Sequence, residues 1–88
     1  MDYYNKSSLI KKLLYQSKNR GCKETGLILS NFAEKFIFQM DEEGLMNFTI
    51  ILMQNDLDIY DWVTAKVIPP KELNSTIMSQ LISFSLYN

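Results

Sequence analysis

The stretch Asn19-Arg20-Gly21-Cys22-Lys23-Glu24-Thr25-Gly26-Leu27-Ile28-Leu29 separates the first amphipathic segment of the chain from the second. It holds the only arginine, the only cysteine and two of the three glycines in the sequence. On a helix that continued through both, Arg20 and Glu24 would share one face, because they are four residues apart. The order Arg-then-Glu is the weaker orientation for such a pair, so helix stability is a poor reason for the placement. The spacing by itself indicates a small charged patch at a helix junction.

Helical periodicity continues on both sides of this stretch. Before it, apolar residues at helical spacing predict a helix over about residues 7–17, capped by Ser7 or Ser8. Gly21 is expected to follow that helix in the left-handed conformation, which glycine adopts without steric cost. A second helix is expected over about residues 23–38. The apolar stripes of the two helices are Leu9, Ile10, Leu13 and Leu14, and then Ile28, Leu29, Phe32, Phe36 and Ile37.

Three further helices are expected toward the C-terminus. Asp41 would cap the third, because an aspartate side chain accepts hydrogen bonds from the first turn of a helix. Asn55 or Asp56 would cap a fourth over about residues 57–65. Pro70 would open a fifth helix that runs through about residue 85, since proline suits the first helical position. The residues expected to face the core are Leu45, Phe48, Ile51, Leu52 and Met53 on the third helix, Ile59, Tyr60, Trp62 and Val63 on the fourth, and Ile77, Met78, Leu81, Ile82 and Phe84 on the fifth.

Length and composition point to one all-α domain. A chain of 88 residues with 47% apolar residues is long enough for a single core. Alternating strand patterns are missing, and no apolar run approaches the roughly 18 residues of a membrane span. We therefore expect a compact bundle of about five short helices over residues 1–88, without membrane insertion, and with residues 1–6 and 86–88 frayed.

The inventory of reactive side chains argues against an enzyme. The sequence has no histidine, which removes the usual general base and the commonest metal ligand. Cys22 lies beside Lys23 and near Arg20, but a nucleophilic cysteine also needs a base, and the sequence offers none. A single cysteine also excludes an internal disulfide, as in a reducing compartment. We expect no catalytic residues and no metal site.

Charge is unevenly distributed along the chain. Residues 1–23 carry six positive charges and one negative charge, whereas residues 24–88 carry three positive and nine negative charges. A basic N-terminal face can bind nucleic acid, a membrane surface or an acidic protein, or it can simply be solvated. A small protein-interaction or nucleic-acid-binding module that uses this face is therefore the alternative function.

The acidic and aromatic residues of the fourth helix have two readings each. Asp56, Asp58 and Asp61 lack the glycine and terminal glutamate of a calcium loop, and carboxylates at a helix start explain them better. Tyr60 and Trp62 could stack on bases, but aromatic residues at helical spacing usually belong to the core.

Two motifs together resemble a known family, the succinate dehydrogenase flavinylation factors, or flavinators. Arg20-Gly21-x-x-Glu24 after a first helix is similar to their RGxxE motif, and residues 27–32 are similar to the apolar stretch that follows it. Asn55-Asp56-Leu57-Asp58-Ile59-Tyr60-Asp61-Trp62 resembles their Asp-Asp-Pro-Asp-Leu-Phe-x-Trp signature. The resemblance covers about residues 9–63. The chain departs from the family pattern at Asn19, often basic there, at Gly26, often acidic, and at Leu57, often proline.

The resemblance implies a five-helix assembly factor that binds the flavoprotein subunit of succinate dehydrogenase, with the fumarate reductase flavoprotein as a further candidate client. Such a factor would promote covalent attachment of FAD to a histidine of that subunit. No tightly bound cofactor is therefore expected in this chain, and nucleic acid is not an expected partner. The partner-binding residues it implies are Asn19, Arg20, Gly21, Lys23, Glu24 and Leu27, with Asp56, Asp58, Tyr60 and Trp62 as a secondary family motif. In the absence of a recognisable presequence, the sequence favours the bacterial cytoplasm over the mitochondrial matrix.

Overall fold

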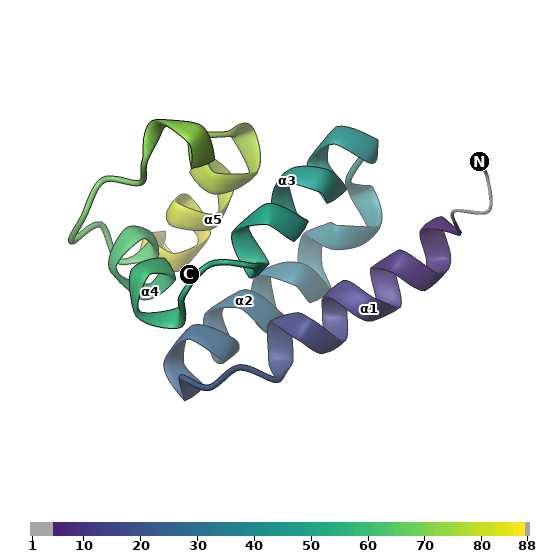
Figure 1. Cartoon of the computed structure of the whole chain (residues 1–88), viewed down its shortest axis with the longest axis horizontal. Helices are drawn as coiled ribbons and strands as arrows, with labels where there is room; N and C mark the ends of the chain where they lie inside the picture. The colour runs from purple at the N-terminus through teal and green to yellow at the C-terminus, as the bar shows by residue number, and fades with distance from the viewer. Residues whose placement is uncertain (1–4, 88) are drawn as a thin grey trace.

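The computed structural model, which describes residues 5–87, is mostly helical (Figure 1). Short links join the first four α-helices, and a longer connection over residues 64–75 leads to the last. This part of the chain contains no strand, so the prediction of an all-α fold with five short helices is confirmed. No helix in it is both long enough and apolar enough to span a membrane. The α-helices are α1 (Lys6–Lys18), α2 (Lys23–Phe36), α3 (Glu42–Leu52), α4 (Asp56–Val63) and α5 (Thr76–Tyr87), and the single 3-10 turns are η1 (Ile37–Gln39) and η2 (Lys71–Leu73).

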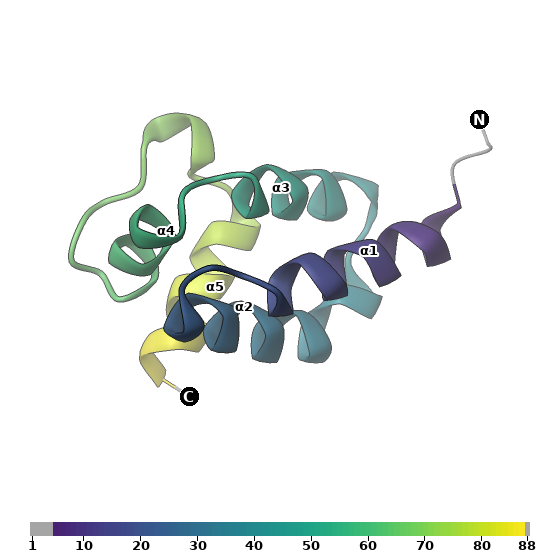
Figure 2. The same ribbon diagram turned by 60° about the horizontal axis from the view of Figure 1, so that its bottom comes forward.

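The first two helices form an antiparallel pair. They lie side by side in both views, and residues 19–22 link them at one end (Figures 1 and 2). Helix α3 packs against α1 and α5, while α4 packs against α2 and α5. The radius of gyration is 12.3 Å, close to the roughly 12 Å expected for one globule of this length. The α1–α2 link lies next to the turn between α3 and α4, because Arg20 in the link hydrogen-bonds to Leu52, Gln54 and Asp56.

The core forms where the apolar stripes of all five helices meet. Phe32 of α2 is fully buried and packs against the rings of Phe36, Phe48 and Phe84 at centroid distances of 5.0, 5.8 and 5.6 Å. The predicted stripes are confirmed as buried or partly buried, with one exception. Met53 is 76% exposed, because α3 ends at Leu52 and the chain turns there toward α4.

Side chains cap the helices largely as the sequence predicts. The Asp41 carboxylate accepts a hydrogen bond from the Gly44 N–H at 2.8 Å, and Asn55 accepts one from the Leu57 N–H at 2.8 Å. The expected cap of α1 at Ser7 or Ser8 is wrong, because Asn5 accepts bonds from both of their N–H groups. The helix thus begins one residue earlier than expected.

The last two predicted boundaries are also displaced. Pro70 precedes the short turn η2 instead of opening α5, which begins at Thr76 after the Ser75 hydroxyl accepts a bond from the Met78 N–H. Helix α4 ends at Val63, because Ala65 adopts a left-handed conformation with φ of 65°. The turn at Ala65 is closed by the hydrogen bond from Ala65 N–H to Trp62 C=O and by that from Lys66 N–H to Asp61 C=O.

At the two ends, part of the expected fraying falls on ordered helix. Asn5 and Lys6 form the cap and first residue of α1, and Leu86 and Tyr87 belong to α5. Residues 1–4 and residue 88 lie outside the described part of the chain.

Candidate partner-binding site

The link between α1 and α2 differs from the expected left-handed turn. Helix α1 ends at Lys18 with Asn19 as its C-cap, and Gly21 has no positive φ. The expectation that Gly21 is a left-handed cap is therefore wrong. Arg20 and Glu24 also do not share a helix face, since Arg20 precedes the first residue of α2.

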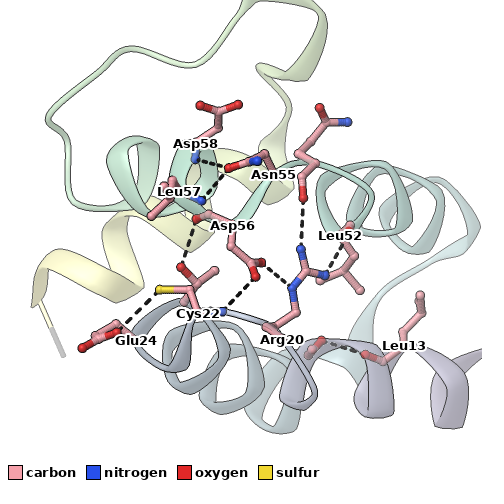
Figure 3. A network of polar contacts seen from close by, with 12 residues as sticks. Leu13, Arg20, Cys22, Glu24, Leu52, Asn55, Asp56, Leu57 and Asp58 are labelled. Carbon is pink, nitrogen blue, oxygen red and sulfur yellow. Dashed lines mark hydrogen bonds and ion pairs between the residues drawn. The ribbon is translucent and has the colours of Figure 1, made fainter.

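Arg20 instead reaches across to the turn between α3 and α4 (Figure 3). Its Nε donates to Asp56 Oδ1 at 2.7 Å, and its two terminal nitrogens donate to the carbonyl oxygens of Leu52 at 2.7 Å and Gln54 at 3.1 Å. The side chain is only 11% exposed. The guanidinium thus meets the negative end of α3 and an acidic residue at the start of α4, an arrangement that helix electrostatics favours.

Asp56 returns two contacts to the start of α2. Its second carboxylate oxygen accepts a hydrogen bond from the Cys22 N–H at 3.0 Å, and its backbone carbonyl accepts one from the Thr25 hydroxyl at 3.0 Å. Two segments that are about 35 residues apart in sequence are therefore joined by five polar contacts. We call these five contacts, made by Arg20, Cys22 and Thr25 on one side and Leu52, Gln54 and Asp56 on the other, the Arg20–Asp56 clamp.

The clamp changes the acidity of Asp56. Burial alone would raise the pKa of this carboxyl, but hydrogen bonds from Arg20, Cys22 and Gly21 and the charge of Arg20 outweigh burial. The pKa of Asp56 therefore lies below its ordinary value. A lowered folded-state pKa means that the ionised carboxylate stabilises the fold at neutral pH.

Acid should remove this contribution. We expect Asp56→Asn to lower the free energy of unfolding by about 1–2 kcal/mol at pH 7, because hydrogen bonds to a charged group are stronger than neutral ones. The difference between wild type and variant should stay constant above about pH 5 and shrink as the pH falls below about 4, toward the folded-state pKa. Urea titrations from pH 7 to pH 3 measure it. Asp58→Asn, which removes an exposed carboxylate of the same helix, is the control. A difference that persists unchanged to pH 3 would contradict the argument.

Around the clamp, most of the predicted partner-binding residues are exposed. Asn19, Gly21, Lys23 and Glu24 face solvent, and Leu27 is 62% exposed. We call these five residues the junction surface. Among the side-chain contacts made here, the Cys22 thiol donates to a Glu24 carboxylate oxygen at 3.5 Å, and the Asn19 side-chain amide donates to the Tyr15 carbonyl oxygen at 3.0 Å. The surface thus presents two opposite charges and an apolar side chain from the first turns of α2.

The secondary family motif divides between three environments. Asp56 belongs to the clamp, whereas Asp58 is exposed on the first turn of α4. Trp62 is 7% exposed and belongs to the core. Tyr60, two residues earlier, is half-buried. The core interpretation of Trp62 is therefore confirmed. Leu57, which stands where the family often has proline, is 66% exposed.

Sequence reasoning missed two residues of this region. Thr25 is fully buried and holds the Asp56 carbonyl, although nothing in its spacing distinguishes it from a surface threonine. Gly26 is buried, and a Cβ there would lie 3.2 Å from the Lys18 carbonyl oxygen. An acidic residue at this position, as the family often has, would require the end of α1 to move. A glycine inside a helix pattern is the signal for such a close approach.

The region offers surface features and not an enclosed cofactor site. A hollow of about 560 Å³ lies between the end of α1 and the α3–α4 turn, bordered by Arg20 and Gly21. Two exposed side chains, Tyr15 and Met53, also line it. Within residues 5–87, no three acidic or thiol side chains converge to hold a metal ion. The geometry is that of an exposed surface next to the Arg20–Asp56 clamp.

Comparison with known proteins agrees with the resemblance noted in the sequence. Residues 11–85 match the family described as flavinator of succinate dehydrogenase. Relatives named succinate dehydrogenase assembly factor 2, mitochondrial, are 42% identical in Saccharomyces cerevisiae, 40% in Dictyostelium discoideum and 37% in Arabidopsis thaliana. These matches cover 84%, 80% and 81% of this chain and 48%, 50% and 38% of the relatives. The chain thus spans about half the length of the curated relatives it matches, or less.

The comparison also corrects one expectation. The bacterial cytoplasm was favoured on the sequence alone, but these relatives are all named as mitochondrial proteins, so that assignment is wrong. The match over residues 11–85 includes both motifs and all of the clamp. This chain belongs to the family of flavinators of succinate dehydrogenase.

Proposed function

We propose that this chain binds the flavoprotein subunit of succinate dehydrogenase and promotes the covalent attachment of FAD to it. Family membership and the similarity to succinate dehydrogenase assembly factor 2 support this role. The structural observation that carries it is the junction surface, an exposed charged and apolar patch that the Arg20–Asp56 clamp supports from beneath. A rigid exposed patch of this kind loses little conformational entropy on binding.

The junction surface offers suitable contacts for a protein partner. The Glu24 carboxylate can accept charge-assisted hydrogen bonds, and Leu27 can bury its exposed side chain. Gly21 presents backbone without a side chain, which permits close approach. We propose that these groups hold the flavoprotein in a form competent for flavin attachment.

The covalent chemistry is proposed to belong to the partner and its flavin. Flavin chemistry is supplied by the cofactor, and a protein contributes binding and orientation. This chain would act as a non-enzymatic assembly factor that influences FAD attachment without holding FAD tightly itself. Because these relatives are named as mitochondrial proteins, we also propose that this chain acts in mitochondria.

Co-expression tests the proposal directly. The chain is expressed with a succinate dehydrogenase flavoprotein subunit in cells that lack their own factor, and covalent flavin is read as in-gel fluorescence after denaturation. We expect fluorescence at the flavoprotein band only when the chain is present. Absence of both fluorescence and a complex on a sizing column would contradict the proposal. The fumarate reductase flavoprotein, tested in parallel, reports whether a second client exists.

Glu24 is expected to matter in this assay. Glu24→Ala removes a charged acceptor worth about 1.5–3 kcal/mol in a desolvated contact, which corresponds to roughly 10- to 100-fold weaker binding. Covalent flavin should fall accordingly at limiting expression, while the circular dichroism spectrum stays that of the wild type. Glu34→Ala, another exposed glutamate of α2, is the matched control and should retain full fluorescence. Normal flavin content in Glu24→Ala would count against the role of Glu24.

One observation favours the alternative function. Lys6, Lys11, Lys12 and Lys18 are all exposed on α1, so the lysines of the basic N-terminal face are available to a partner. Nucleic-acid binding through that face would weaken steeply with added salt. Titration of a labelled oligonucleotide at two salt concentrations would detect it, and a complex that persists at physiological salt would favour this function.

A further inference from the structure

The start of α2 lacks a side-chain cap of its own. Its N-cap residue, Cys22, makes no side-chain hydrogen bond to the helix, unlike Asn5, Asp41 and Asn55 on α1, α3 and α4. The Cys22 N–H is instead bound by the Asp56 carboxylate. The position of this helix end is therefore set by a contact from another part of the chain.

Arg20 is held along its whole length. Its guanidinium group makes the three hydrogen bonds to Leu52, Gln54 and Asp56 described above. Its aliphatic part lies against α2, because a Cβ placed on Gly26 would be 3.5 Å from both the Cβ and the Cγ of Arg20. The side chain thus packs against α2 and hydrogen-bonds to the α3–α4 turn.

Glu24 stands between two residues that the same clamp holds. On one side the Cys22 N–H donates to the Asp56 carboxylate (Figure 3). On the other side the Thr25 hydroxyl donates to the Asp56 carbonyl oxygen. Any shift of Asp56 therefore moves the backbone on both sides of Glu24. Asp56 is in turn held by Arg20 at 2.7 Å.

We propose that Arg20 is a positioning residue: acting through Asp56, it fixes the direction in which Gly21 and Glu24 face the partner and does not itself contact the partner. The burial of its side chain and the engagement of its nitrogens within the chain support this role over direct contact. The proposal rests on the proposed function for the identity of the partner. The two charged residues of the Arg-Gly-x-x-Glu run thus have different roles. Arg20 makes contacts within the chain, whereas Glu24 contacts the partner.

The free chain gives a first readout that is independent of any partner. Arg20→Ala should release Asp56, so we expect the Cys22 amide hydrogen to exchange at least about tenfold faster and the Glu24 and Thr25 amide resonances to shift. Amides in the middle of α3 and α5 should keep their rates. Lys18→Ala, which removes a positive charge two residues away, is the control and should leave the Cys22 amide protected. Unchanged exchange at Cys22 in Arg20→Ala would overturn the proposal.

A double-mutant cycle on partner binding gives the second readout. Arg20→Ala, Glu24→Ala and the double variant are titrated with the flavoprotein subunit at a temperature where circular dichroism shows all three folded. If Arg20 acts by positioning Glu24, each single substitution should weaken binding about tenfold. The double variant should bind only a little more weakly than either, because the Glu24 contact is already lost once Arg20 is replaced. Arg20→Lys keeps the ion pair but not the fork of hydrogen bonds, and should fall between wild type and Arg20→Ala.

The other outcomes are distinguishable. An additive loss of about a hundredfold in the double variant would mean that Arg20 contacts the partner independently, and would overturn the proposal. Unchanged affinity of folded Arg20→Ala, with only a lower melting temperature, would reduce the clamp to a stabilising contact and overturn it as well. A wild-type chain that does not bind the flavoprotein would overturn the proposed function, and the inferred positioning would then be judged by the amide exchange alone.

Discussion

Phe32→Ala is expected to lower the free energy of unfolding by about 4 kcal/mol. Phe32 is fully buried where α2 faces α3 and α5, and its ring packs against three other phenylalanine rings. Truncation of a buried phenylalanine costs about 3–5 kcal/mol, because apolar burial is lost and a cavity remains. The lost aromatic pairs add to that cost. Since a domain of this size has roughly 5–10 kcal/mol of stability, the variant would lose a large part of it.

Urea unfolding followed by circular dichroism measures the loss, and the chain supplies a matched control. Phe38 lies six residues further on and is 65% exposed. Phe38→Ala should change the free energy of unfolding by no more than about 0.5 kcal/mol. A loss below about 1.5 kcal/mol for Phe32→Ala, or equal losses for the two variants, would mean that the helices do not pack around Phe32 as described.

The buried position of Phe32 could be predicted because the residues that a helix buries follow a regular spacing in the sequence. An apolar side chain on every third or fourth position identifies both a helix and the face it buries. Capping is local as well, since Asp41 and Asn55 bond to N–H groups only two or three residues away. Boundaries failed where neighbouring local signals compete, as Asn5 does with Ser7 and Ser8 for the cap of α1. Pro70 satisfies the rule for a first helical residue, but the chain completes the turn η2 before Ser75 starts α5.

The sequence singled out most residues of the candidate site, but it did not indicate which residues they contact. Spacing within one helix suggested that Arg20 and Glu24 act together, because pairwise rules of this kind apply only along a continuous helix. The actual partner of Arg20 is Asp56, 36 residues later. Sequence periodicity does not indicate such a tertiary contact. It also does not indicate the two backbone carbonyl oxygens that accept hydrogen bonds from the guanidinium group. The family signature contained Asp56 without indicating what it binds.

The structure of the link also changes what a glycine at position 21 means. Gly21 does not have a positive φ, so its backbone conformation is not one that glycine alone adopts readily. An added Cβ would lie 3.4 Å from Asp56 Oδ2, which is normal van der Waals contact. Gly21→Ala should therefore leave the fold intact, and a compatible Gly-to-Ala change stabilises by about 0.4–1 kcal/mol through the unfolded chain. The fold does not require glycine here, which leaves the exposed surface as the reason for it.

We accordingly expect Gly21→Arg to weaken partner binding severely while the chain stays folded. Gly21 is exposed on the junction surface, and a long side chain there would stand between the partner and the backbone it must approach. A misfit of about 3 kcal/mol in such a contact weakens binding about 100-fold. Titration with the flavoprotein subunit and in-gel flavin fluorescence measure the loss, and thermal unfolding checks the fold.

Charge and size at this position can be separated. An arginine at position 21 also brings a second guanidinium near the Asp56 carboxylate, where it would compete with Arg20 for the same oxygens. Gly21→Met adds similar bulk without charge. If the partner approaches the backbone closely, methionine should weaken binding almost as much as arginine, and alanine much less. Full loss with arginine but normal binding with methionine would show instead that the Arg20–Asp56 clamp had been disrupted. Gly21 would then matter for what it keeps away from Asp56, and the close-approach argument would be wrong.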